Sequence, residues 1–132
     1  MMIKGIHHVS MKCIKEDYEK VKSFYVDLLG LKILREWDEG VMIDAGGDMI
    51  EVFNNGTERF SKGIFTHIAF HTDDVDELAG KVKNAGYEVF IKPCDKEIPS
   101  DPPYRIRMAF CHGPLGEEVE FFCEKQVLYE SI

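Results

Sequence analysis

The chain has 132 residues, the length of one domain, and an ordinary globular composition with 45% hydrophobic and 30% charged residues. Its 16 basic and 24 acidic residues give a formal net charge of −8. This balance disfavours nucleic acid and an anionic membrane surface as the main partner. We therefore expect a small-molecule substrate, with no nucleic acid and no membrane. A local lysine or arginine could still hold an anionic substrate.

The cysteines and the beginning of the chain predict a cytoplasmic location. The cysteines lack C-x-x-C spacing and the density of a disulfide scaffold, so we expect reduced thiols; they are Cys13, Cys94, Cys111 and Cys123. The first residues lack the apolar stretch of a signal peptide, and no segment approaches membrane-spanning length.

The first half of the chain predicts the order β-α-β-β-β. Residues 6–13 alternate in character as a strand does. Tyr18, Val21, Tyr25 and Leu28 then recur at helical spacing, and Gly30 is a helix stop. Glycine-containing turns separate the three strands that follow, which we predict at 31–37, 41–45 and 49–53.

The second half repeats this order, which indicates an internal duplication. Residues 65–71 predict a strand, and Asp73 or Asp74 is a plausible cap for a helix that Gly86 stops. In that helix the apolar residues Val75, Leu78, Val82 and Ala85 recur with the intervals of the first one. Three more strands are predicted at 87–92, 104–111 and 118–123.

Two segments fall outside the repeated pattern. Residues 94–103 (CDKEIPSDPP) contain three prolines and several polar residues, so we predict a loop inserted between strands, with a lid over the site or a plain surface connection as alternatives. Residues 124–132 form a predicted tail that frays or docks on a partner subunit. The whole chain, 1–132, is then one domain made of a module at 3–53 and a module at 64–123.

Four residues hold matching places in the two halves: His8 and Glu51 in the first, His67 and Glu120 in the second. Because side chains alternate along a strand, each of the four lies on the less apolar face of its strand, while the more apolar face packs under a helix. A single strand histidine is more often a packed residue than a ligand. Chance explains two matched histidine–carboxylate pairs less well than it explains one histidine. Their nitrogen and oxygen ligands suit Ni, Zn, Co, Mn or Fe ions.

Strand geometry limits this predicted metal site. Lys12 and His71 lie four residues beyond His8 and His67, about 13 Å along a strand. They are therefore predicted to reach the substrate rather than the metal. His7 is expected to face away from His8 and to be structural. Core packing is expected for a set of large apolar residues, some of which could wall an apolar pocket: Trp37, Phe53, Met108, Phe110 and Phe122.

Other catalytic patterns are absent from the sequence. It contains no G-x-x-x-x-G-K-[ST], G-x-G-x-x-G, H-E-x-x-H or G-x-S-x-G segment. No local spacing places a cysteine beside a base, which a thiol nucleophile would need. The metal interpretation is thus the sharpest one that the residues support.

The chain resembles the vicinal oxygen chelate superfamily, which includes glyoxalase I, methylmalonyl-CoA epimerase, fosfomycin-resistance proteins and extradiol dioxygenases. The resemblance covers residues 3 to 123. It rests on the sequence segments IHHVS at 6–10, FY and LLGL at 24–31, MIEVF at 49–53, THIAF at 66–70, and GPLGE followed by VEFF at 113–122. It implies an α+β fold in which two tandem βαβββ modules form a curved, half-open mixed β-sheet around a cleft, with helices on the outside.

The ligand set is most similar to that of glyoxalase I, which typically shows His, Glu, His and Glu at the positions of His8, Glu51, His67 and Glu120. Epimerases of the family usually carry Gln at the position of Glu51, and fosfomycin-resistance proteins and dioxygenases use two His and one Glu. The resemblance therefore implies a glyoxalase I-like lyase or isomerase (lactoylglutathione lyase-like) that moves a proton through a metal-bound enediolate. Its substrate would have two adjacent oxygens, as the hemithioacetal of methylglyoxal has.

The resemblance also implies roles for individual residues and partners. Glu120 is the expected base, with Glu51 next, and the metal is Ni, Zn, Co or Mn. Lys12 stands where bacterial glyoxalases carry an Arg near the glutathione carboxylates, and Asn55, with Asn54, stands near their Asn. Arg107 is a further candidate to hold an anionic substrate group. Glutathione or another thiol is a possible co-substrate, and a homodimer is expected, with each site built within one chain or across two.

Two alternatives remain from the same superfamily. One is a metal-free binding protein that sequesters a small molecule, as bleomycin-resistance proteins do. The other is a thiol transferase of the fosfomycin-resistance type. The family's usual Asp-Pro-Asp-Gly turn is replaced here by Gly-Pro-Leu-Gly at 113–116, and 94–103 does not match the glutathione-binding segment of known glyoxalases.

Overall fold

The computed structural model describes residues 2, 4, 6–60, 63 and 65–125. The chain divides into two compact units, each described here by itself: Met1–Ile64 with Pro114–Gly116, and Phe65–Gly113 with Glu117–Ile132. None of the helices in the described ranges has the length and apolar character needed to cross a membrane.

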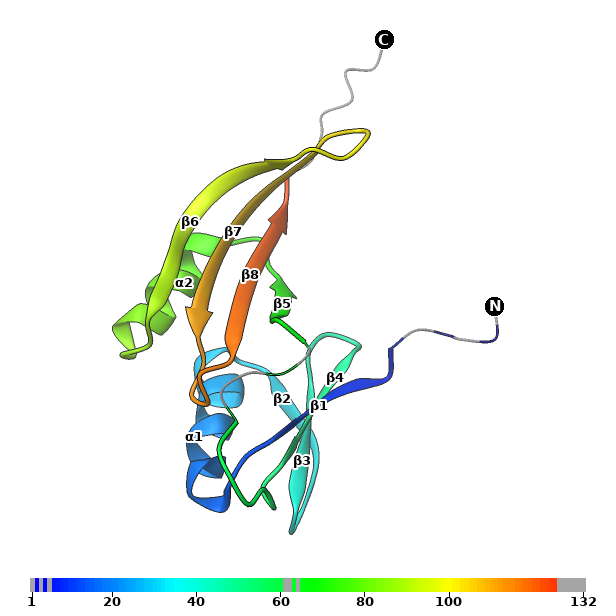
Figure 1. Cartoon of the computed structure of the whole chain (residues 1–132), viewed down its shortest axis with the longest axis vertical. Coiled ribbons are helices and arrows are strands. Elements are labelled where there is room, and N and C mark those ends of the chain that lie inside the picture. The colour runs from blue at the N-terminus through cyan, green and yellow to red at the C-terminus, as the bar shows by residue number, and fades with distance from the viewer. Residues whose placement is uncertain (1, 3, 5, 61–62, 64, 126–132) are drawn as a thin grey trace. The chain divides into compact units, whose positions relative to one another are not determined.

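The first unit is a four-stranded mixed sheet with one irregular helical segment (Figure 1). The strands lie in the order β1-β4-β3-β2, with β1 and β4 parallel and the other pairs antiparallel. The elements are β1 (His8–Lys12), η1 (Lys15–Asp17), α1 (Tyr18–Lys22), the π-helix η2 (Ser23–Leu28), β2 (Lys32–Trp37), β3 (Gly40–Asp44) and β4 (Met49–Phe53).

The second unit has the same plan. Its strands lie in the order β5-β8-β7-β6, and again only the first pair is parallel. The elements are β5 (Ile68–His71), α2 (Val75–Asn84), β6 (Val89–Ile98), β7 (Tyr104–His112) and β8 (Glu118–Glu124). The predicted α+β class and the repeated β-α-β-β-β order are confirmed.

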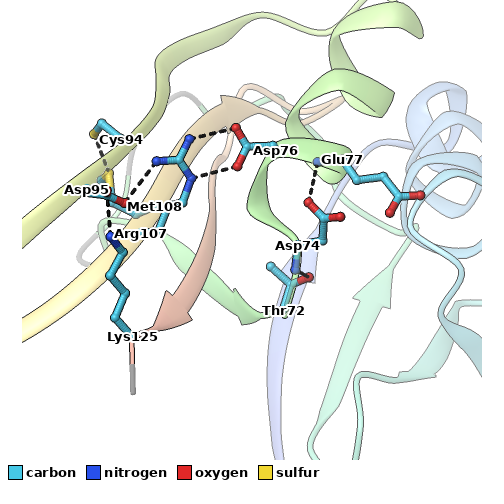
Figure 2. Close-up of polar contacts among 9 residues, drawn as sticks. All are labelled: Thr72, Asp74, Asp76, Glu77, Cys94, Asp95, Arg107, Met108 and Lys125. Atoms are coloured by element: carbon cyan, nitrogen blue, oxygen red, sulfur yellow. Dashed lines mark hydrogen bonds and ion pairs between the residues drawn. The ribbon is translucent and has the colours of Figure 1, made fainter. Parts of the chain in front are cut away.

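The ends of α2 follow from its sequence. The side chain of Asp74 accepts a hydrogen bond from the backbone N–H of Glu77 at 3.0 Å, as an N-cap residue does (Figure 2). At the other end Gly86 adopts φ +96°, a left-handed conformation that glycine adopts without strain. Of the two predicted cap candidates, Asp74 is the cap, and the predicted stop at Gly86 is correct.

In each unit the most deeply buried residues lie on one face of the sheet, although Met42 in the first unit and Ile106 and Met108 in the second are also buried on the other face. In β4 the buried residues are Ile50 and Val52, and in β8 they include Val119 and Phe121. In the second unit α2 packs against β6, β7 and β8. Because successive side chains in a strand point to opposite faces, Glu51 and Glu120 lie on the other face of their sheets.

The predicted loop at 94–103 is wrong in its first half. β6 continues to Ile98 and pairs with β7 as far as Tyr104, so only residues 99–103 form the connection. The three prolines of the segment all fall in this connection. The charged residues at 95–97 suggest a loop by composition, but β6 is an edge strand, where charged side chains and even Pro93 are tolerated.

The predicted tail at 124–132 is shorter at its start, because Glu124 still belongs to β8. Residues 126–132 lie outside the described residues. Lys125 is described, and its Nζ forms an ion pair with Asp95 at 2.7 Å.

A charged network on the helix side of the second sheet joins α2 to β6 and β7. Arg107 donates from Nε and Nη2 to the two oxygens of Asp76 at 2.7 and 2.8 Å, and from Nη1 to Asp95 at 3.0 Å (Figure 2). The Arg107 guanidinium holds the pKa of Asp76 below its ordinary value, and Lys125 and then Arg107 do the same for the pKa of Asp95.

Arg107→Met is expected to lower the Tm at neutral pH by removing both contacts. A carboxyl whose pKa is lowered by folding stabilises the protein above its unfolded pKa and loses that effect as pH falls through the folded value. The Tm difference from the unmodified protein should therefore shrink as the pH falls below about 4. Arg105→Met is the matched control, since among the described residues Arg105 has a single ion pair, with Glu97 at 3.8 Å. An equal loss of Tm in both variants, or a loss that persists at low pH, would contradict this account.

Candidate functional site

The first unit brings His8 and Glu51 together. His8 begins β1, Glu51 is the central residue of β4, and the two strands are parallel neighbours. Nε2 of His8 lies 3.5 Å from Oε1 of Glu51. The imidazole is 38% exposed and the carboxylate 12% exposed, so the pair opens to solvent from the histidine side.

The second unit contains an equivalent pair. Nε2 of His67 lies 3.1 Å from Oε1 of Glu120, with the imidazole 35% and the carboxylate 9% exposed. His67 stands directly before β5, and Glu120 lies in β8, the parallel neighbour of β5. The same two atoms thus approach each other in both units.

The strand registers are the same at the two pairs. Ser10 is the register partner of Glu51, and Ala69 is the register partner of Glu120. In both units this partner stands two residues after the histidine. The predicted matching of His8 with His67, and of Glu51 with Glu120, therefore agrees with the strand pairing of each unit.

Each histidine has its second ring nitrogen occupied by the residue that precedes it. Nδ1 of His8 lies 2.9 Å from Nδ1 of His7, and Nδ1 of His67 lies 2.8 Å from Oγ1 of Thr66. If His8 and His67 carry their protons on Nδ1, they donate to these partners, and both Nε2 atoms face the carboxylates as acceptors. This is the arrangement by which metal-binding histidines are commonly oriented.

The two carboxylates differ in one respect. The hydroxyl of Ser10 donates to Oε1 of Glu51 at 2.7 Å, whereas Ala69 offers no donor at the same register position. Burial raises the pKa of Glu120, and the nearby imidazole of His67 partly offsets this effect. Glu51 is thus held by a serine hydrogen bond that has no counterpart at Glu120.

The donor atoms fit a divalent transition metal. Two ligands about 2.1 Å from one ion, at about 90° to 110° from each other, lie roughly 3.0 to 3.4 Å apart, close to the two separations observed. Imidazole nitrogen with carboxylate oxygen suits such ions. Within the described residues no group of three or more histidine, cysteine, aspartate or glutamate side chains is arranged to hold a metal, so the candidate ligands come as pairs.

Three predicted substrate-binding residues are found as follows. Lys12 lies on the same face as Glu51, with its Nζ 5.9 Å from the ring centroid of Phe53. His71 is the exposed last residue of β5, on the face of Glu120. The side-chain amide of Asn55 donates to Glu39 at 2.7 Å, and the neighbouring Asn54 is buried and donates to the backbone oxygen of Asp38.

Arg107 is not placed to hold a substrate beside Glu120. In β7 its register partner is Cys123, whereas Glu120 pairs with Phe110. Since 107 and 110 differ by an odd number of residues, Arg107 projects to the opposite face, where its donors serve Asp76 and Asp95. The sequence prediction used the charge of this arginine without the parity of its strand position.

Sequence reasoning missed the roles of three residues next to the pairs: His7, Thr66 and Ser10. The expectation that His7 faces away from His8 is wrong, because the two rings are in contact. His7 precedes β1, as Thr66 precedes β5, and the alternation of side chains holds only within a strand. Ser10 could have been found, because alternation assigns it to the face of His8 and its hydroxyl can reach a carboxylate.

Comparisons with known proteins match nearly the whole chain. The family model described as "Glyoxalase/Bleomycin resistance protein/Dioxygenase superfamily" matches residues 5–121. The uncharacterized protein YwkD of Bacillus subtilis (strain 168) is 29% identical over 135 residues, covering 92% of this chain and 98% of YwkD.

Solved structures have the same fold. A glyoxalase family protein from Enterococcus faecalis superposes with a TM-score of 0.71 at 22% identity, covering 92% of this chain and 99% of that one. A lactoylglutathione lyase from Agrobacterium tumefaciens superposes with a TM-score of 0.64 at 18% identity, covering 92% and 94%.

Proposed function

Because this chain belongs to the glyoxalase/bleomycin resistance protein/dioxygenase superfamily, we propose that it is a metal-dependent lyase or isomerase of the glyoxalase I type. The observation that carries the proposal is the repeated pair: an imidazole Nε2 facing a carboxylate Oε1 in each unit. The lactoylglutathione lyase among the structural neighbours is consistent with this reaction class.

The ligand set proposed is His8, Glu51, His67 and Glu120. One pair supplies two ligands, fewer than a divalent ion requires, so a complete site needs both pairs, from one chain or from two chains of a homodimer. When bound, a Ni, Zn, Co or Mn ion would draw negative charge from two adjacent oxygens of the substrate. The preceding residues, His7 and Thr66, orient the two imidazoles.

Glu120 is the residue we assign as the base. Its carboxylate is buried, which raises its pKa, and its register neighbour Ala69 leaves it without the hydrogen bond that Ser10 gives Glu51. A carboxylate of raised basicity that no serine hydroxyl holds is the better one to take a proton from the carbon beside a carbonyl and return it to the neighbouring carbon. Glu51, held by Ser10, is the better fixed ligand.

Ser10→Ala is expected to weaken metal binding by about tenfold, the lower end of the range for residues that orient ligands. The cause is the loss of the 2.7 Å hydrogen bond that fixes Glu51. Competition with a chromophoric chelator measures the affinity, and Ser10→Thr should restore it because threonine keeps the hydroxyl. Ser23→Ala, in η2, is the unrelated serine control and should leave the affinity unchanged. Failure of threonine to rescue would show that the hydroxyl is not the cause.

The substrate is proposed to be small and to carry two adjacent oxygens, such as the hemithioacetal that methylglyoxal forms with glutathione or another thiol. The proposed location is cytoplasmic, where such thiols are abundant. Asn55 and His71 stay proposed substrate contacts, while Arg107 is withdrawn because it serves the helix face.

The test is a combined metal and activity assay. Purified protein is stripped with a chelator, reloaded with Ni, Zn, Co or Mn, and assayed with methylglyoxal plus glutathione or other thiols. The proposal expects metal uptake, a Tm that rises on reloading, and turnover with at least one metal and thiol. Binding of small molecules without any metal uptake would instead support the sequestering function. Metal-dependent thiol addition to an epoxide, unaffected by Glu51→Gln, would support the thiol transferase.

A further inference from the structure

A row of four residues crosses the first sheet beside Glu51 and has no part in the proposed proton transfer. Lys12, Phe53, Gly40 and Trp37 are successive register partners across β1, β4, β3 and β2. Directly opposite residues project to the same face of a sheet. This row, called here the aromatic row, therefore shares the face of Glu51, about 7 Å further along the strands.

The absence of a side chain at Gly40 gives the row its form. A Cβ at this position would lie 3.0 Å from Cζ2 of Trp37 and 2.7 Å from the backbone oxygen of Val52. The indole of Trp37 therefore lies over the backbone of β3, in space that any other residue would occupy. Its ring meets that of Phe53 edge to face, with centroids 6.1 Å apart and an interplanar angle of 77°.

These two rings are not core residues of the first unit. Trp37 is 38% exposed and Phe53 is half-buried, whereas Phe24 and Tyr25 of the core are almost completely buried. An exposed indole beside a phenyl ring offers apolar, planar surface to a ligand. The sequence-based expectation of core packing is therefore not met for these two residues, and they fit its alternative, in which some of the large apolar residues wall an apolar pocket.

Positive charge lies at this surface. Lys12 ends the aromatic row, with its Nζ above the ring of Phe53. Arg35 shares the face, since its register partner Met42 is in turn the partner of Glu51. Within the described ranges neither Lys12 nor Arg35 forms an ion pair with a carboxylate. Two such cations in a chain of net charge −8 favour an anionic ligand.

We propose that the aromatic row binds the non-reacting end of the substrate and that this end is an aromatic carboxylate. The ring lies on Trp37 and Phe53, and the carboxylate reaches Lys12. This inference rests on the proposed function for its view of Glu51 as part of the reacting end. It goes beyond that function by naming a group that the substrate carries: among substrates with two adjacent oxygens, it favours one that bears an aryl ring and a carboxylate over the hemithioacetal of methylglyoxal with glutathione, which has no aromatic ring.

Trp37 is the chain's one tryptophan, so its fluorescence reports on the row directly. The experiment titrates full-length, chelator-treated protein with 3-phenylpropanoate, with the neutral 3-phenylpropanamide, and with the aliphatic anion butanoate. We expect saturable quenching or a spectral shift with 3-phenylpropanoate, roughly tenfold weaker binding of the amide, and no saturable response to butanoate. Because metal is absent, the result is independent of whether the protein is an isomerase.

Two variants assign the contacts. Lys12→Met keeps the length and apolar stem of the side chain, and should bring the affinity for 3-phenylpropanoate down to that for the amide. Phe53→Leu should lower the affinity for both aryl compounds, 3-phenylpropanoate and 3-phenylpropanamide. Lys32→Met is the matched control, because Lys32 is an exposed lysine of β2 outside the aromatic row, opposite Asp44, and should leave all three affinities unchanged.

The proposal is overturned if the amide binds as tightly as the carboxylate, or if Lys12→Met and Lys32→Met behave alike. It is also overturned if the Trp37 emission changes with protein concentration and does not respond to the aryl compounds, since a second copy of the chain would then cover the row. Loss of metal uptake or of isomerase turnover, with this binding pattern intact, would count against the proposed function alone.

Discussion

Replacing Glu120 with glutamine is expected to lower kcat by about three orders of magnitude. A positioned general base contributes roughly 10² to 10⁴ in rate, and glutamine keeps the size of the side chain but cannot accept the proton. Burial raises the pKa of Glu120 above its ordinary value, which favours its carboxylate as a proton acceptor. The measurement is steady-state kinetics with the metal and thiol that support turnover, at metal concentrations that saturate the variant.

Glu51→Gln is the matched comparison, because Glu51 holds the equivalent position in the first unit. This variant should mainly weaken metal binding, and its kcat at saturating metal should fall much less. A larger loss of kcat in Glu51→Gln than in Glu120→Gln would reverse the assignment of base and fixed ligand. Equal losses in the two variants would mean that the hydrogen bond from Ser10 does not distinguish the carboxylates.

The second large effect is expected at the histidines. His8→Ala and His67→Ala should each lower the metal affinity by at least about 100-fold, because even residues that only orient a ligand contribute roughly 10- to 100-fold. Each change removes the Nε2 atom that faces a carboxylate at 3.5 or 3.1 Å. Isothermal titration of chelator-treated protein with the metal measures the loss without any need for turnover.

The control for the histidine variants is His112→Ala. Its Nδ1 lies 2.9 Å from Oε1 of Glu88, and its ring stacks on Phe90 with centroids 4.3 Å apart, so it is a third histidine–glutamate pair in a different setting. This variant should bind metal as the unmodified protein does. A loss of affinity as large as that of His67→Ala would mean that the ion is held elsewhere, and the proposed ligand set would be wrong.

Much of each unit could be predicted from local patterns in the sequence. The period-2 alternation around Glu51 and Glu120 assigned their faces correctly, because strand geometry leaves only two directions for a side chain. Asp74 and Gly86 marked the ends of α2 for equally local reasons. The prediction of a loop at 94–98 was wrong because charged residues and prolines are found in loops and in edge strands alike. Only the pairing of β6 with β7 separates the two.

The contacts around the pairs needed the tertiary structure. The partnership of His7 with His8, and of Thr66 with His67, lies just outside the strands, where no periodicity applies. Arg107 is no longer a candidate substrate contact because it pairs with Asp76, 31 residues away, and no local pattern encodes this pairing. The aromatic row likewise exists only through the register of four strands.

The duplicated β-α-β-β-β order and the candidate ligands could be predicted without the structure, because both follow from short-range periodicity and from the chemistry of side chains. Which atoms meet depends on how distant segments pair: Nε2 approaches Oε1 in each unit, Ser10 donates to Glu51 while Ala69 has no hydroxyl to do the same for Glu120, and Trp37 lies over Gly40. The physical reason is that strand register is set by cooperative hydrogen bonding and packing over distant segments. A shift of one residue in register would carry every one of these side chains to the other face.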